Sequence, residues 1–248
     1  MSFNDNDFMN LLKYYKNMDN FHEKAKITYD NLDNISKSEN NNHFIENNEI
    51  FMYNFDNICF NANLRENGKP KRNLPASTDA IYFNEEKSTL YFLEFKNLPL
   101  KSTDYKKELE TIINLLKSNY NIDEYIINSL DNIYKRFEDE IICKLKNKTN
   151  ESLFFSLPLI YETYCEKLGM DYNQSQNDFI LWLLNLNKKF IFVFAENNEI
   201  SPSNRHFSFE VRLKDKIKYF DNLPNIQTTI TTKNNFENNF IHKHFDNS

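Results

Sequence analysis

Two apolar segments separated by a short polar stretch constrain the fold of this chain most strongly. Residues 79–83 (DAIYF) and 89–97 (TLYFLEFKN) flank the polar segment 84–88 (NEEKS). Both segments are rich in aromatic residues and carry apolar residues on both faces, which is typical of strands covered on both faces. The pattern therefore predicts a β-hairpin inside a sheet.

Three charged residues interrupt these apolar strands. Side chains alternate along a strand, so Glu94 and Lys96 lie on the same face. A turn centred between Glu86 and Lys87 places Asp79 opposite Glu94. Directly opposed residues share a face, with Cβ atoms about 5 Å apart. The sequence thus predicts that Asp79, Glu94 and Lys96 lie together.

Two opposed carboxylates repel each other unless a cation lies between them. Mg²⁺ binds oxygen ligands and commonly uses one or two carboxylates, with water and substrate phosphate completing its shell. Lys96 would stabilise charge or orient an attacking water. This combination is suited to metal-assisted phosphodiester hydrolysis with Mg²⁺ (or Mn²⁺) as cofactor. The alternative is a solvated strand face with an Asp79–Lys96 ion pair.

The spacing from Asp79 to Glu94-Phe95-Lys96 resembles the PD-(D/E)XK nuclease superfamily. Residues 85–87 and 104–106 also match the (D/E)-x-K half of that motif, but only residues 94–96 lie in an apolar strand at a hairpin distance from an Asp. Thr78 stands where the motif has Pro.

This resemblance implies an α/β fold with a mixed central sheet flanked by helices, the restriction-endonuclease-like core. It implies that Asp79 and Glu94 bind the metal and that the Phe95 carbonyl is a further ligand. Lys96 would be the catalytic lysine of a phosphodiesterase (nuclease).

The resemblance also implies an acidic residue from the first helix and a polar residue from the helix that follows the hairpin. Glu23 is the better candidate for the first, and Glu46 is the second candidate. Lys106 and Lys107 are both in position for the other role, and the choice between them stays open.

A basic loop precedes the hairpin at residues 61–76 and contains Lys69, Lys71 and Arg72. Taken alone it is an ordinary solvated loop. Beside a metal site these three residues would contact nucleic-acid phosphates.

The rest of the chain has a mixed α/β pattern within one domain, residues 1–248. A block at 121–186 is almost wholly helical, and we interpret it as an insertion. Other predicted helices cover 5–17, 20–35, about 102–119 and about 208–220; predicted strands cover 49–60, 189–195 and about 226–232, followed by an irregular tail.

Composition excludes several classes of protein. Two glycines cannot build a P-loop or a Rossmann phosphate loop. The three cysteines and five histidines lack zinc-site spacing. The N-terminus lacks signal-peptide features, and no apolar run approaches the roughly 20 residues of a membrane span. These features predict a cytoplasmic protein, or a nuclear one in a eukaryote, with no membrane partner.

The expected partner is nucleic acid, with DNA favoured over RNA, and a homodimer or a protein partner is left open. A net charge of −6 opposes a general nucleic-acid coat protein but allows a local basic groove. The alternative function is a non-catalytic nuclease-fold subunit that binds or scaffolds a larger assembly. A third interpretation is an unrelated α/β interaction protein.

Overall fold

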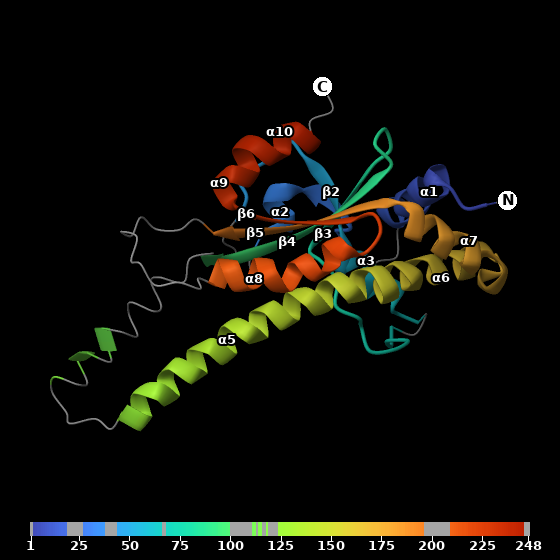
Figure 1. The fold of residues 1–248 in the computed structure, drawn as a ribbon. Coiled ribbons are helices and arrows are strands. Elements are labelled where there is room, and N and C mark those ends of the chain that lie inside the picture. The colour runs from blue at the N-terminus through green and yellow to red at the C-terminus, as the bar shows by residue number, and fades with distance from the viewer. Residues whose placement is uncertain are drawn as a thin grey trace.

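The computed structural model describes residues 2–18, 27–37, 44–65, 68–99, 111–112, 114–115, 118, 124–195 and 209–245. These residues form an α/β fold around one six-stranded mixed sheet, with helices on both faces (Figure 1). The strands lie in sequence order: β1 (Tyr29–Asn31), β2 (Phe51–Asn54), β3 (Ala80–Asn84), β4 (Thr89–Pro99), β5 (Asn187–Ala195) and β6 (Ile226–Thr232). The expected α/β class with a mixed, helix-flanked sheet is confirmed.

The first four strands pair antiparallel, whereas β4–β5 and β5–β6 pair parallel. In the β3–β4 hairpin, Ala80 pairs with Leu93 and Asn84 pairs with Thr89. One step further along, this register sets Asp79 against Glu94. The predicted hairpin and its register are therefore confirmed.

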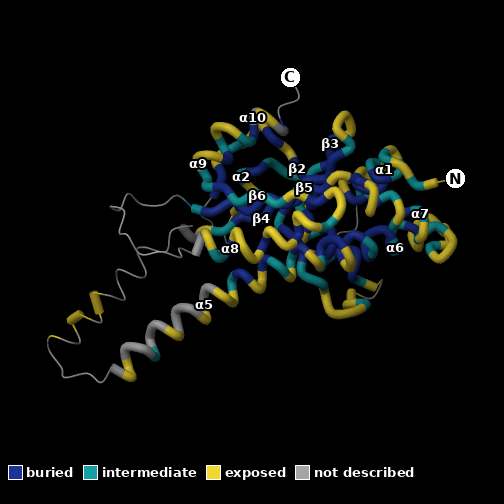
Figure 2. The backbone as a smooth tube through the Cα atoms, viewed as in Figure 1, coloured by how far each residue is buried: buried dark blue, intermediate teal, exposed yellow. Residues whose placement is uncertain are grey.

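Two hydrophobic cores cover the two faces of the sheet. The larger core contains Phe92 and Phe190, whose rings stack with centroids 4.4 Å apart, and packs against α1 (Asp5–Asn17), α3 (Phe55–Ala62) and the helices between β4 and β5. The smaller core contains Leu93 and Val193. It packs against α2 (Leu32–Ile35), the π-helical turn η4 (Phe236–Phe240) and α10 (Ile241–His244). Buried residues gather on the strands and on the helix sides that face them (Figure 2).

The helical block between β4 and β5 joins these two parallel strands, as a crossover connection must. It contains α5 (Glu124–Glu151), the π-helical turn η2 (Ser152–Ser156), α6 (Leu157–Leu168) and α7 (Tyr172–Asn185). The C-terminal part of α5 packs on the sheet, while its N-terminal part projects beyond it (Figure 1). Gly169 ends α6 with φ +66°, a left-handed conformation that favours glycine. After the crossover, α8 (Phe209–Ile217) and the 3₁₀ turn η3 (Lys218–Asn222) lead into β6.

Three predicted elements were wrong, at least in part. Residues 29–31 are strand rather than helix, and α2 is a single turn; residues 19–26 of that predicted helix lie outside the described part of the chain. The strand predicted at 49–60 ends at Asn54, because the Asn54 side chain accepts a hydrogen bond from the Asn57 amide and begins α3. The tail expected to be irregular contains α9 (Lys233–Asn235), η4 and α10.

Of the helix predicted at about 102–119, only residues 111–112, 114–115 and 118 are described, and they are helical. No helix among the described residues is long and apolar enough to cross a bilayer.

Candidate functional site

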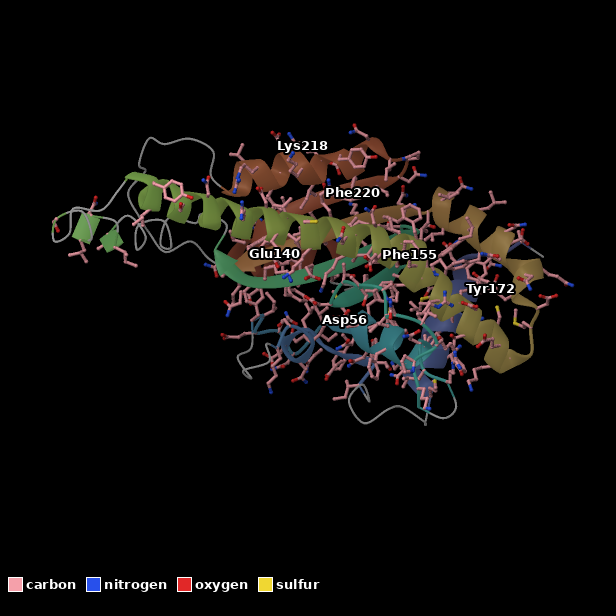
Figure 3. All side chains as sticks on the ribbon, turned by 90° about the horizontal axis from the view of Figure 1, so that it is seen from below. Asp56, Glu140, Phe155, Tyr172, Lys218 and Phe220 are labelled. Atoms are coloured by element: carbon pink, nitrogen blue, oxygen red, sulfur yellow. The ribbon has the colours of Figure 1, made fainter. Side chains whose placement is uncertain are left out.

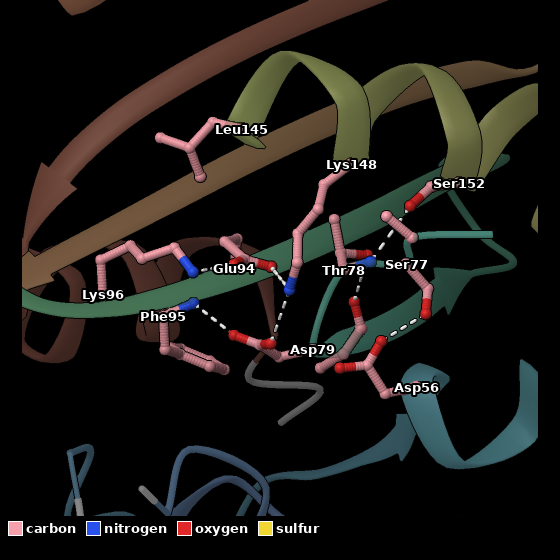
Figure 4. A network of polar contacts seen from close by, with 12 residues as sticks. Asp56, Ser77, Thr78, Asp79, Glu94, Phe95, Lys96, Leu145, Lys148 and Ser152 are labelled. Carbon is pink, nitrogen blue, oxygen red and sulfur yellow. Dashed lines mark hydrogen bonds and ion pairs between the residues drawn. The ribbon is translucent and has the colours of Figure 1, made fainter. Parts of the chain in front are cut away.

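The three charged hairpin residues lie on the face of the sheet that α5 covers (Figure 4). Asp79 immediately precedes β3, and Glu94 and Lys96 lie two positions apart in β4. The Glu94 side chain is fully buried, whereas the side chains of Asp79 and Lys96 are 24% and 28% exposed. The group is therefore closed to solvent at Glu94 and open to it at Asp79 and Lys96.

A fourth charged residue, Lys148 of α5, reaches between the two carboxylates (Figure 4). Its Nζ lies 2.9 Å from Glu94 Oε2 and 3.3 Å from Asp79 Oδ1. Lys96 Nζ contacts the other oxygen, Glu94 Oε1. Both carboxylates thus converge on a single positive atom, and the Asp79–Lys96 pair of the alternative interpretation is replaced by Asp79–Lys148 and Glu94–Lys96 pairs.

The backbone of β4 orients Asp79. The Phe95 amide donates a hydrogen bond to Asp79 Oδ2 over 2.7 Å, which leaves Oδ1 directed to Lys148. The Phe95 ring packs on the other face of the sheet, in the smaller core.

The segment that leads into Asp79 is held by the junction of α5 and η2. Glu151 accepts a hydrogen bond from the Ala76 amide. Ser152 Oγ accepts one from the Thr78 amide over 3.1 Å, and Ser156 Oγ donates one to the Ala76 carbonyl over 3.3 Å. A π-helical turn widens the helix locally and is frequent at functional sites. Here three polar side chains around this turn hold the segment 76–78, which leads into Asp79.

A pocket of about 410 Å³ adjoins this group. Lys148 lines it, together with Asp56 from the first turn of α3, and Asp56 accepts a hydrogen bond from Ser77 Oγ. Seen from the helical side, α5 runs between α8 and Asp56 (Figure 3). The other lining residues are Asn57, Phe60, Leu74, Pro75, Ala76 and Ser77.

Burial and charge shift the protonation of these groups. Burial, together with the charge of Asp79, raises the pKa of Glu94 to about 7, against the opposing effect of Lys148 and Lys96. Partial burial and the charge of Asp79 act to raise the pKa of Asp56, and the exposure of its side chain limits this shift. Burial lowers the pKa of Lys148, but the three carboxylates raise it more, so the net pKa lies above its usual value.

No protein-family model, curated protein or solved structure matches this chain. The chemistry of the site therefore rests on its own residues.

Neither Asp56 nor Lys148 was among the site residues predicted from the sequence. Asp56 lies in a segment that was predicted as strand, and its only signal was the capping residue Asn54 two positions earlier. Lys148 is one of three lysines in the stretch 144–148 (KLKNK), and nothing in the sequence separates it from Lys144.

The other predicted site residues lie apart from this group or outside the described residues. Lys71 Nζ pairs with Glu166 of α6 over 2.6 Å, and Arg72 pairs with Glu162. The basic loop is thus tied to α6, Lys69 is exposed within it, and its binding to phosphates stays a prediction. Glu46 pairs with Lys233 over 3.5 Å. Glu23, Lys106 and Lys107 lie outside the described residues.

Within the described ranges, no three His, Cys, Asp or Glu side chains are placed to hold a metal ion together. Asp79 and Glu94 form a two-carboxylate candidate. This number is compatible with Mg²⁺, which takes most of its remaining ligands from water and substrate.

Proposed function

We propose that this protein is a PD-(D/E)XK-type nuclease that uses Mg²⁺ or Mn²⁺ to hydrolyse the phosphodiester bonds of nucleic acid, DNA in the first instance. One observation carries the proposal: Asp79 and Glu94 converge on a single cationic atom, with Lys96 on the same face. The antiparallel run β2–β3–β4, followed by a helical crossover to the parallel strand β5, is compatible with a restriction-endonuclease-like core.

The residues present suit a hard divalent cation. Among the described residues, Glu94 Oε1 is buried without a hydrogen-bond partner, although Lys96 Nζ is in contact with it. Buried carboxylate oxygens are costly unless a cation or a donor satisfies them. Asp79 and Glu94 would hold the ion, with the Phe95 carbonyl as a further ligand.

A bound divalent ion would supply Lewis acidity and a more acidic water. The chain itself supplies position and charge. The Phe95 amide fixes Asp79, and the partly exposed Lys96 can approach a phosphate at the open end of the site. An ammonium held in a partly dry site stabilises negative charge that develops on that phosphate.

A second candidate is the non-catalytic subunit with the same fold. The observation that favours it is Lys148, whose ammonium already neutralises both carboxylates. In such a network the two ammonium groups balance the two carboxylates, so no divalent ion is needed to neutralise them.

Cleavage assays with metal separate the two candidates. Linear, circular and single-stranded DNA, and RNA, are incubated with Mg²⁺ or Mn²⁺ and with wild type, Lys96→Ala, Asp79→Asn or Lys144→Ala. Lys144 is the matched control, because it lies on α5 with 70% of its side chain exposed. We expect wild type and Lys144→Ala to cleave, and the two site variants to lose roughly 100-fold or more of the rate.

Absence of cleavage by folded wild type on every substrate would contradict the nuclease proposal and favour the non-catalytic subunit. Loss of cleavage in Lys144→Ala as well would show that the effect is not specific to the site.

A further inference from the structure

We infer that Lys148 is an exchangeable cation: it neutralises Asp79 and Glu94 when no metal is bound, and it moves toward Asp56 in the adjoining pocket when a divalent ion binds, where it contacts a nucleotide phosphate. This inference rests on the proposed function, because it concerns the same carboxylate pair. It goes beyond that function by assigning a role to α5 and to the pocket.

The Lys148 ammonium lies between the two carboxylates. Lys148 Nζ contacts Asp79 Oδ1 and Glu94 Oε2. The other Asp79 oxygen accepts the Phe95 amide, so Oδ1 is the Asp79 oxygen available to a metal. A divalent ion and an ammonium a few ångströms apart repel each other strongly in a partly buried site. Metal binding between these carboxylates therefore requires the ammonium to leave.

The side chain of Lys148 can move although its helix is fixed. Leu145 and Thr149, on either side of Lys148 in α5, are fully buried, and Thr149 Oγ1 donates to the Leu145 carbonyl over 3.0 Å. The helix is thus anchored to the core at this point. The Lys148 side chain is 23% exposed and has a flexible four-carbon stem. The side chain can therefore move while the helix stays in place.

The adjoining pocket is the destination of the displaced Lys148 ammonium. Lys148 lines the pocket of about 410 Å³, and Asp56 lines the same pocket. The displaced ammonium would keep a counter-ion there, so its charge would not be left unpaired. Ser77 and Asn57 add polar groups to the lining, and Phe60, Leu74 and Pro75 add apolar surface. A pocket of this size with mixed lining suits a nucleotide unit better than a bare ion.

The exchange predicts that removing the Lys148 ammonium shifts the affinities for the divalent ion and for a phosphate-bearing ligand in opposite directions. Without the Lys148 ammonium, a divalent ion no longer competes for Asp79 Oδ1 and Glu94 Oε2 and binds more tightly. Without it, the pocket also loses its cation, and a phosphate-bearing ligand binds less tightly. A lysine that only supports the fold would not shift the two affinities in opposite directions.

Calorimetric titrations test the exchange. Mn²⁺ is titrated into wild type, Lys148→Met and the control Lys144→Met, and a thymidine dinucleotide is then titrated at saturating Mn²⁺. We expect Lys148→Met to bind Mn²⁺ about 10-fold more tightly and the dinucleotide about 5-fold more weakly than wild type. Lys144→Met should match wild type in both.

Thermal unfolding gives a second readout. In EDTA, Lys148→Met should melt below wild type because Asp79 then loses its ammonium partner and Glu94 keeps only Lys96, and Mn²⁺ should raise its midpoint more than that of wild type. Lys148→Gln, which keeps a donor for Glu94, replaces the Met variant if that variant does not fold.

The titrations distinguish failure of the exchange from failure of the proposed function. Unchanged or weaker Mn²⁺ affinity in both Lys148 variants would overturn the exchange and leave the nuclease proposal intact. Unchanged dinucleotide affinity would overturn the role of the pocket. Absence of Mn²⁺ binding by every variant would overturn both the exchange and the proposed function.

Discussion

Glu94 is the residue whose protonation matters most to this site, because its carboxyl group is fully buried beside another carboxylate. A buried carboxylate in this setting is retained only at a cost, which Lys96 and Lys148 partly offset. Its charge state therefore couples the stability of the fold to pH.

Substitution of Glu94 by Gln tests this coupling. Burial raises the pKa of Glu94 from 4.5 to about 7. A group whose folded pKa is raised contributes stability that is complete below its unfolded pKa and is lost as pH rises through its folded pKa. Wild type should thus lose up to about 3 kcal/mol relative to Glu94→Gln between about pH 5 and 8.

Denaturant unfolding of both proteins across that pH range measures the difference in slope. Glu140→Gln is the control, since Glu140 is 61% exposed on α5. Parallel pH profiles for wild type and Glu94→Gln would show that Glu94 keeps an ordinary pKa.

At the residue scale, the sequence was sufficient to place Asp79, Glu94 and Lys96 together. Strand alternation and a turn centre are local properties, and they determined the facing pair. Lys148 could not be found in this way. It lies 54 residues from Glu94, and its position depends on how α5 crosses the sheet.

At the scale of elements, the junction between α5 and α6 shapes the site through its π-helical turn. An ordinary α-helix would set Glu151, Ser152 and Ser156 at different angles to the segment that contains Thr78. No sequence pattern predicts such a turn, because the stretch 152–156 (SLFFS) is equally compatible with an α-helix. The turn is decided by tertiary contacts with residues 76–78.

Ser152→Ala should weaken both the fold and the metal site. Thr78 is fully buried, and its amide donates to Ser152 Oγ, so the variant leaves a buried N–H without its partner. The expected loss is about 1–3 kcal/mol in the free energy of unfolding. Because Thr78 precedes Asp79, weaker Mn²⁺ binding should accompany it.

Urea unfolding and Mn²⁺ titration check these two effects, with Asn150→Ala as the control because Asn150 is exposed on the same helix. Equal losses of stability and Mn²⁺ affinity in the two variants would show that the Ser152–Thr78 hydrogen bond contributes no more than an exposed residue does.

The boundary between β2 and α3, which the sequence did not predict, has a local cause. Asn54 caps α3 inside a stretch whose aromatic residues suit a strand equally well. Composition alone does not decide between a strand and a helix of two turns when both bury the same residues. The boundary was set by the cap and by packing of Phe55 and Ile58 in the larger core.

At the scale of the whole molecule, both faces of the sheet must be covered, and this explains the C-terminal helices. Strands β4 and β5 are apolar on both sides, a pattern that predicts two covering layers. The helical block between them, together with α1 and α3, accounts for one layer. The second layer comes mainly from segments too short or too polar to be recognised by periodicity: α2, residues 44–50, η4 and α10.

Phe236→Ala tests whether the C-terminal turn is an integral layer of the fold. Phe236 is fully buried in the smaller core, where its ring lies 6.2 Å from Phe95, the residue between Glu94 and Lys96. Removing a buried aromatic ring costs about 3–5 kcal/mol when the cavity does not collapse. The exposed neighbour Lys243 serves as control, and Lys243→Ala should change stability by less than about 0.5 kcal/mol.

Guanidinium unfolding of the two variants gives the comparison, and Mn²⁺ affinity of Phe236→Ala shows whether the loss reaches the site. Because Phe95 packs on Phe236 and its amide holds Asp79, we expect weaker Mn²⁺ binding along with lower stability. A stability loss near that of Lys243→Ala would mean that β4 and β5 keep their cover without the C-terminal turn. In that case the layer formed by α2 and residues 44–50 would be sufficient to hold β4 and the site residues it carries.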